Sequence, residues 1–252
     1  FIVLYIFRTN KEKIMTTKTK KSVGVRQTSG GIDLYLKKIF TLMFGAVAVT
    51  AITAFATIYM GGINLLVSNG GMTPLFYIVI FGGLALSIWA QVRAFSMRPA
   101  VAAILLFIYA VMIGLGLTPI IWGGLAVNPA SIVWAFVISA IMFGFMAAFG
   151  YKTAKDLSFL GIFLMMGMIG LILVGIVSMI WTLGGTFSTI VCAIGVLVFA
   201  LFTAYDMQTL KRSYTVLGDD VQRDQLAVLG ALHLYISFIA MFQYVLGLLN
   251  RD

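Results

Sequence analysis

Long apolar runs recur along the chain between short polar connections. Seven of these runs reach the length of a membrane-crossing helix, since a hydrocarbon core of about 30 Å takes roughly 20 helical residues. The runs are continuous and lack the alternation of apolar and polar positions that a membrane β-barrel needs. The predicted spans cover residues 39–60, 73–90, 100–121, 130–149, 159–181, 188–206 and 226–249. Proline is expected at or near span edges, at Pro74, Pro99, Pro119 and Pro129.

Composition supports the same fold class. The chain is 62% hydrophobic and 10% charged, with a mean hydropathy of +1.07 over 252 residues. A water-facing surface of this size needs far more charge, so a soluble fold is excluded. The sequence predicts an all-α polytopic membrane protein, with one seven-helix domain over residues 31–252. Residues 1–30 form a basic extension that we expect to be disordered, and Met15 is the expected true start.

The basic residues predict the orientation. Lys and Arg precede the first span and occupy the second, fourth and sixth connections, whereas the other connections hold none. The side rich in Lys and Arg is the cytoplasmic one, so the N-terminus is predicted inside and the C-terminus outside. The net charge of +9 is then a topology signal and a contact surface for anionic lipid, and nucleic acid is not an expected partner. Cys192 is the single cysteine, which excludes an intrachain disulfide.

Two ionisable side chains inside the spans are the main candidates for function. Ionisable groups are costly in a bilayer and usually face the bundle interior. Asp206 is the only acid within the predicted spans and His233 the only histidine. Asp206 shares a helix face with Thr203, Phe199 and Gly195, and this face should point at neighbouring helices. The residues leave two interpretations open: an interfacial carboxylate that meets Lys211 and Arg212, or a packed functional group.

The last span has a polar face of its own. His233 and Ser237 lie one turn apart on it, which makes this helix a natural centre for the bundle. The basic-side ends of the sixth and seventh spans adjoin, so Asp206 and His233 are expected near each other. Asp156 stands where the fifth span begins, and we expect it to cap free N–H groups of that helix.

Three segments resemble the Bax inhibitor-1 family, the transmembrane Bax-inhibitor-motif proteins, in a bacterial form. The stretch "GVLVFALFTAYDMQTLK" is similar to the family's Tyr-Asp-Thr-Gln signature. The stretches "GYKTAKDLSFLGIFLMMGMIGLI" and "GALHLYISFIAMFQYVLGLL" resemble its fourth connection with fifth helix and its last helix, and "FIYAVMIGLGLTPI" fits in hydrophobic phasing. The resemblance runs over about residues 30–250.

The resemblance implies six helices around a central seventh, in the bacterial inner membrane. It also implies a pH-sensitive leak for calcium or other cations, gated by two aspartates on helices six and seven that share a proton. The helix-six aspartate corresponds to Asp206, with Met207 in place of the usual threonine. A basic residue near the end of the second helix is the family's candidate latch, for which Arg93 and then Arg98 are the nearest positions.

This chain departs from the family pattern at the second aspartate, which corresponds to Ser237. One carboxylate and a hydroxyl make a poor calcium site, because calcium prefers six to eight oxygens including several acidic ones. Asp206 is therefore the only candidate metal ligand, and a weak one. We expect His233 to replace the missing partner, since an aspartate and a histidine favour each other's charged forms and the imidazole titrates near neutral pH.

Two functions from different classes remain open. The first is a calcium-type cation or proton leak with Asp206 as the sensor. The second is a non-conducting membrane regulator that docks on other membrane proteins, in stress response or membrane-protein quality control. The ladder Ala140, Gly144 and Ala148 suits close helix contact, within the bundle or with a partner.

Enzymatic activity is not expected, and neither is a cofactor. A presenilin-type aspartate pair fails because Val216 stands where Gly-x-Gly-Asp needs glycine and only 13 residues separate Asp206 from Asp219. A rhomboid-type dyad fails because His233 and Ser237 share one helix and no Gly-x-Ser-Gly surrounds the serine.

Overall fold

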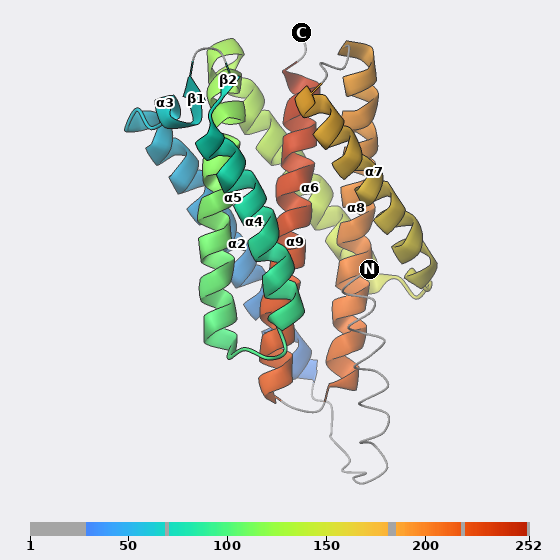
Figure 1. The fold of residues 1–252 in the computed structure, drawn as a ribbon. Helices are drawn as coiled ribbons and strands as arrows, with labels where there is room; N and C mark the ends of the chain where they lie inside the picture. Colours follow the sequence, from blue (N-terminus) through green and yellow to red (C-terminus); the bar gives the residue numbers. More distant parts are fainter. Residues whose placement is uncertain (1–28, 69–70, 181–184, 218–219, 251–252) are drawn as a thin grey trace.

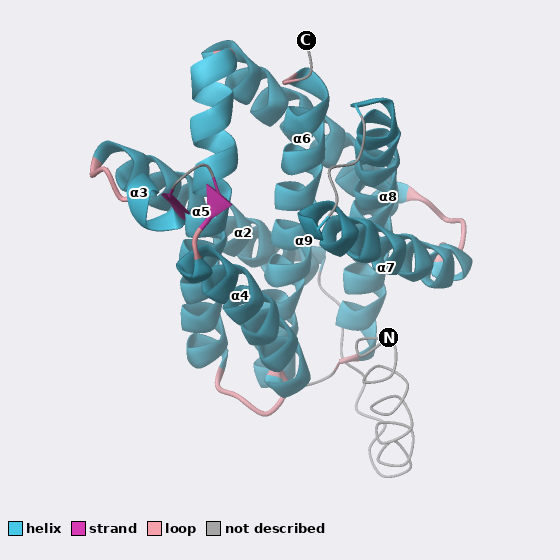
Figure 2. Ribbon diagram, turned by 45° about the horizontal axis from the view of Figure 1, so that its top comes forward, coloured by secondary structure: helices cyan, strands magenta, loops and turns pink. Residues whose placement is uncertain are grey.

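The computed structural model describes residues 29–68, 71–180, 185–217 and 220–250. Within these ranges the protein is a bundle of seven long helices (Figure 1). They are α2 (Ser29–Tyr59), α4 (Pro74–Arg93), α5 (Pro99–Val127), α6 (Pro129–Lys152), α7 (Ser158–Ile180), α8 (Gly185–Val216) and α9 (Asp220–Leu249). One end also carries the short helix α3 (Ile63–Leu66) and an antiparallel pair of two-residue strands, β1 (Val67–Ser68) and β2 (Gly71–Met72), as Figure 2 shows.

Each predicted span coincides with one of these helices, and all seven are long and apolar enough to cross a membrane. The all-α polytopic class is therefore confirmed. Of the predicted N-terminal extension, residues 1–28 lie outside the described residues, and Ser29 and Gly30 belong to α2.

Proline marks three helix starts, as expected. Pro74, Pro99 and Pro129 stand in the first turns of α4, α5 and α6, where a missing N–H costs nothing. The expectation for Pro119 was wrong, because it lies inside α5, which continues to Val127. Membrane helices tolerate an internal proline when neighbouring groups satisfy the freed backbone.

The last helix is the centre of the bundle. In α9, 83% of the most apolar 18-residue stretch is buried, against 11% to 44% in the other helices. It packs against α2, α5, α6 and α8 (Figure 1). Helix α7 lies at the periphery and packs against α8, as both views show. The centrality of α9 explains why it carries polar side chains that would be costly against lipid.

Close helix approaches are made at small residues. A Cβ added to Gly150 of α6 would lie 2.1 Å from the Ala204 carbonyl oxygen of α8, so the two backbones touch there. At Gly195 of α8 the added atom would lie 2.6 Å from the Tyr244 ring of α9. Without a hydrophobic drive between helices in lipid, such contacts carry much of the packing energy.

A buried polar network ties three helices together. The Thr50 hydroxyl of α2 donates to the Ala110 carbonyl oxygen of α5 at 3.0 Å and lies 2.6 Å from the Tyr235 hydroxyl of α9. The Tyr235 ring packs edge-on against Tyr109 of α5. Sequence reasoning missed this network, because hydroxyl groups of Thr and Tyr carry no signal in an apolar run.

Lysine and arginine of the described residues gather at one end of the bundle, called here the basic end. It consists of the first turns of α2, the α4–α5 and α6–α7 connections, and the segment where α8 ends and α9 begins. The charge distribution predicts that this end is cytoplasmic.

Candidate functional site

Asp206 lies within a continuous helix. Helix α8 runs on to Val216, ten residues beyond the predicted end of the span. The charged residues that ended the apolar run are compatible with helix, because Gln, Leu, Lys and Arg all have good helix propensity. The Asp206 side chain is half-buried, one turn after the fully buried Thr203.

The register of α8 and α9 places Asp206 beside the sequence-predicted residues of the last helix. Leu210 of α8 lies against Gly230 of α9, and Gly195 lies against Tyr244. Because α8 and α9 are antiparallel, these two contacts fix which residues of the two helices lie opposite each other. Asp206 then lies at the same height in the bundle as His233, within about one residue. Ser237, 4% exposed, lies one turn further along α9, away from the basic end.

The expected contact between Asp206 and His233 is not formed in this conformation. The imidazole Nε2 of His233 lies 3.4 Å from the Gln91 side-chain oxygen of α4. Within the described ranges, no hydrogen bond or ion pair involves the Asp206 side chain. The structure therefore places the two residues at one level and leaves the carboxylate unpaired.

The interfacial interpretation of Asp206 required Lys211 or Arg212 as a partner, and both are engaged elsewhere. The Lys211 ammonium donates to the Tyr151 carbonyl oxygen at 2.8 Å and lies 4.5 Å from the centre of the Tyr151 ring. The Arg212 guanidinium lies 2.7 Å from an Asp156 carboxylate oxygen. Both side chains thus reach the α6–α7 side of α8, and neither binds Asp206 in this conformation.

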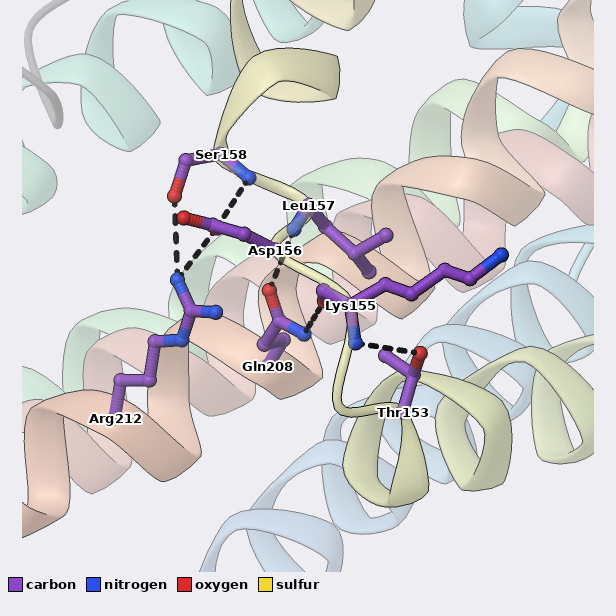
Figure 3. A network of polar contacts seen from close by, with 7 residues as sticks. All are labelled: Thr153, Lys155, Asp156, Leu157, Ser158, Gln208 and Arg212. Carbon is purple, nitrogen blue, oxygen red and sulfur yellow. Dashed lines mark hydrogen bonds and ion pairs between the residues drawn. The ribbon is translucent and has the colours of Figure 1, made fainter.

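Gln208 of α8 binds the α6–α7 connection, as Figure 3 shows. Its side-chain oxygen accepts the Leu157 N–H at 2.9 Å, and its side-chain nitrogen donates to the Lys155 carbonyl oxygen at 2.7 Å. The Gln208 side chain is 5% exposed, so both halves of a buried amide are satisfied. The residue two positions after Asp206 therefore fixes the connection that leads into α7.

The outer part of the same network is an ion pair at the surface. The Ser158 N–H, at the first residue of α7, donates to Asp156 at 2.9 Å, which confirms the predicted cap. Hydrogen bonds from the Ser158 hydroxyl and N–H, and then Arg212, hold the pKa of the Asp156 carboxyl well below its ordinary value. Arg212 also donates to the Ser158 hydroxyl at 3.2 Å (Figure 3).

A second buried amide, Gln225 of α9, holds the α4–α5 connection. Its side-chain nitrogen donates to the Met97 carbonyl oxygen at 2.7 Å. The candidate latch residues Arg93 and Arg98 flank this connection and are both exposed. Among the described residues, no hydrogen bond or ion pair of their side chains is present, so the connection is fixed by Gln225 in this conformation.

The site offers little to a hard metal ion. In the part of the chain that the structure describes, no three His, Cys, Asp or Glu side chains lie together as metal ligands would. Calcium prefers several acidic oxygens, and the sequence offers one carboxylate here, that of Asp206.

Gln208 and Gln225 are the functional-site residues that the sequence did not single out. Glutamine is a common surface residue, and nothing in its immediate sequence indicates burial. For Gln208 one signal was present, since it belongs to the stretch "YDMQTLK" that resembles the family signature. Its role as a loop anchor depends on contacts 51 and 53 residues away along the chain.

Comparison with known proteins supports the resemblance over nearly the whole domain. The family described as "Inhibitor of apoptosis-promoting Bax1" matches residues 33–252. An uncharacterized protein of Caulobacter vibrioides is 34% identical over 92% of this chain and 96% of its own length. The inner membrane protein YbhL of Escherichia coli K12 is 32% identical over 92% of this chain and 97% of its own. An uncharacterized membrane protein of Streptococcus pyogenes serotype M3 is 29% identical over 90% and 96%.

The family match begins at Asp33 in α2 and runs through α9, and the matches cover 96% to 97% of the relatives' own lengths. Their length agrees with that of the domain, and the one with a stated location is an inner-membrane protein. The chain therefore belongs to the Bax inhibitor-1 family, as a multi-pass protein of the inner membrane.

Proposed function

We propose that this protein is a pH-sensitive cation leak of the inner membrane, with Asp206 as its sensor. The observation that carries the proposal is an unpaired, half-buried carboxylate on α8, level with His233 of the central helix. An intramembrane acid is costly and tends to be functional. Because no hydrogen bond or ion pair among the described residues holds the carboxylate, its charge can change with pH without such a contact being broken first.

His233 is the second titrating group of the proposed sensor. An imidazole that takes up a proton carries a positive charge, which attracts a nearby carboxylate. The present contact of His233 with Gln91 of α4 is long, 3.4 Å, and therefore weak. The ring can exchange this contact for one with Asp206 of α8 at little cost in free energy. Protonation of the ring would favour Asp206 over Gln91 and would draw α9 and α8 together at this level. Deprotonation would release the carboxylate for a permeant cation.

The number of carboxylates at the site determines which cation we expect. The family resemblance implies calcium, but a single carboxylate favours a monovalent cation or a proton over tight calcium coordination. We propose calcium flux weaker than that of a two-aspartate site, and we expect Ser237→Asp to raise it.

A non-conducting regulator is the second candidate function. The observation that favours it is the serine at position 237, where the family's second carboxylate is expected. In this function the bundle keeps the family fold, and its partners are other membrane proteins.

Ion flux in liposomes separates the two functions, because a leak needs no partner protein. The purified protein would be reconstituted with calcium and pH dyes and compared with Asp206→Asn between about pH 5.5 and 8. Asp33→Asn is the matched control, since Asp33 is an exposed acid near the start of α2. We expect a leak in the unmodified protein and in the control, and its loss or loss of pH dependence in Asp206→Asn.

Other outcomes would contradict the proposal. A leak that is unchanged in Asp206→Asn would remove Asp206 as the sensor. A protein that is tight at every pH while Ser237→Asp leaks would be a silenced channel scaffold, and the regulator function would then replace the leak.

A further inference from the structure

A groove opens between α2 and α6 on the side of the bundle away from α7. Its volume is about 420 Å³. Phe40 and Phe44 of α2 form one wall, and the ladder of Ala140, Gly144 and Ala148 forms the other. Met207 of α8 and Phe238 of α9 form the floor, so the groove reaches the central helix.

The groove has open space beside Gly144 and packed aromatic rings at its floor. A Cβ added to Gly144 would have no atom within 4 Å, so the ladder faces open space. The Phe238 ring at the floor packs edge-on between Phe136 and Phe143 of α6, with ring centres 5.6 Å apart in both pairs. Such edge-to-face contacts hold aromatic rings in place. Lipid that enters this hollow therefore touches four helices, unlike lipid on the convex outside of the bundle.

The groove is long enough for one hydrocarbon chain. Its lining on α6 extends from Phe136 to Tyr151, which is about 22 Å of helix. This length exceeds the depth of one leaflet, about 15 Å, so an acyl chain from one leaflet fits along the groove.

The groove opens at the basic end. Tyr151 lines this mouth, and the Lys211 ammonium lies over its ring. Lys37 follows the lining residue Leu36, Lys152 follows Tyr151, and both lysines are exposed. Lys37 lies three residues before Phe40 and Lys152 four residues after Ala148, so both lysines share the helix faces that line the groove. Their positive charge at this end favours a negatively charged headgroup.

We propose that this groove binds an acyl chain of an anionic phospholipid from the leaflet at the basic end, with its phosphate held by Lys37 and Lys152. The site is independent of whether the protein conducts ions. It accounts for a small-residue ladder that is not used for helix contact inside the bundle.

Native mass spectrometry of the full chain tests the site. The protein would be released from nanodiscs that contain phosphatidylglycerol and phosphatidylethanolamine in equal amounts. We expect one retained phosphatidylglycerol per chain. Gly144→Phe fills the groove and should reduce retention at least about tenfold, because several methylene groups lose their burial.

Gly170→Phe is the matched control, because Gly170 of α7 is also an exposed membrane-facing glycine with open space around its Cβ position. It should retain lipid like the unmodified protein. If Gly144→Phe does not fold, Ala148→Leu fills the same groove with a smaller side chain. Retention unchanged in the folded groove variant would overturn the proposal.

The headgroup is tested separately with Lys37→Gln combined with Lys152→Gln. This variant should retain the two lipids in the proportion of the nanodisc, whereas Arg93→Gln with Arg98→Gln, which removes equal charge from the same end, should keep the preference. Equal retention of both lipids by the unmodified protein would contradict an anionic ligand. A dimer that Gly144→Phe abolishes would identify the occupant as a second copy and overturn the lipid site.

Discussion

The two faces of α6 contrast sharply although both carry small residues. Towards α8, Gly150 meets the Ala204 backbone so closely that a methyl group has no room. Towards α2, Gly144 faces an open groove. On the first face α6 packs directly against α8, whereas on the second face a gap separates α6 from α2. A small residue in a membrane helix thus leaves space beside the helix. The distance to the neighbouring helix determines whether that helix or lipid occupies the space.

Polar contacts explain why one face is closed. Gln208 and Lys211 of α8 bind the end of α6 and the connection after it, and so fix α6 against α8. Between α2 and α6, the described residues show no hydrogen bond or ion pair. Helices α2 and α6 both pack against α5 and α9, which set the distance between them. The groove lies in the gap that remains.

Replacing each of the two glycines by alanine should give the largest difference in stability between the two faces. We expect Gly150→Ala to lower the free energy of unfolding by more than about 3 kcal/mol, because α6 and α8 must move apart. Gly144→Ala should stay within about 0.5 kcal/mol of the unmodified protein, since its Cβ enters open space. Reversible unfolding in detergent micelles measures both. Equal losses for the two variants would show that the faces do not differ.

Removal of the buried amide should have the next largest effect. Gln208→Leu leaves the Leu157 N–H and the Lys155 carbonyl oxygen without their partner, and we expect a loss of about 1–3 kcal/mol. The same unfolding measurement, together with the rate of tryptic cleavage after Lys155, reports on it. Gln222→Leu is the control, because Gln222 is exposed in the first turn of α9. Cleavage that is no faster than in this control would argue against Gln208 as the anchor of the connection.

The surface ion pair should contribute least. Asp156→Asn keeps an oxygen for the Ser158 N–H and removes the charge that faces Arg212. The depressed pKa of Asp156 means that its contribution to stability is present above about pH 4 and disappears as the pH falls further. We expect a small decrease in melting temperature at neutral pH that vanishes in acid. A decrease that persists at low pH would indicate a packing defect.

The sequence was most informative where one property decides the outcome. Each span is an apolar run of bilayer length, and the burial of Gly195, Phe199 and Thr203 agrees with the face of α8 that was expected to point at neighbouring helices. The end of α8 was predicted too early, because hydropathy falls at Asp206 although helix propensity does not. Hydropathy reports where lipid ends, and α8 projects beyond that point.

The contacts of the site could not be predicted in the same way. Lys211 and Arg212 have several acids and carbonyl groups within reach, and only the placement of the α6–α7 connection decides among them. The ladder of Ala140, Gly144 and Ala148 was expected to meet another helix. Its surroundings depend on the distance between α2 and α6, which α5 and α9 set.

The position of α9 has a consequence for biogenesis. This helix holds the bundle together, yet it is the last of the seven spans to leave the ribosome, and its mean hydropathy of 1.8 is the lowest of the seven. The six earlier helices must therefore enter the membrane before their common core exists, with the Thr50 hydroxyl of α2 already able to bind α5. Assembly ends when Tyr235 arrives and completes that network. Any truncation that removes α9 should leave inserted helices without a bundle.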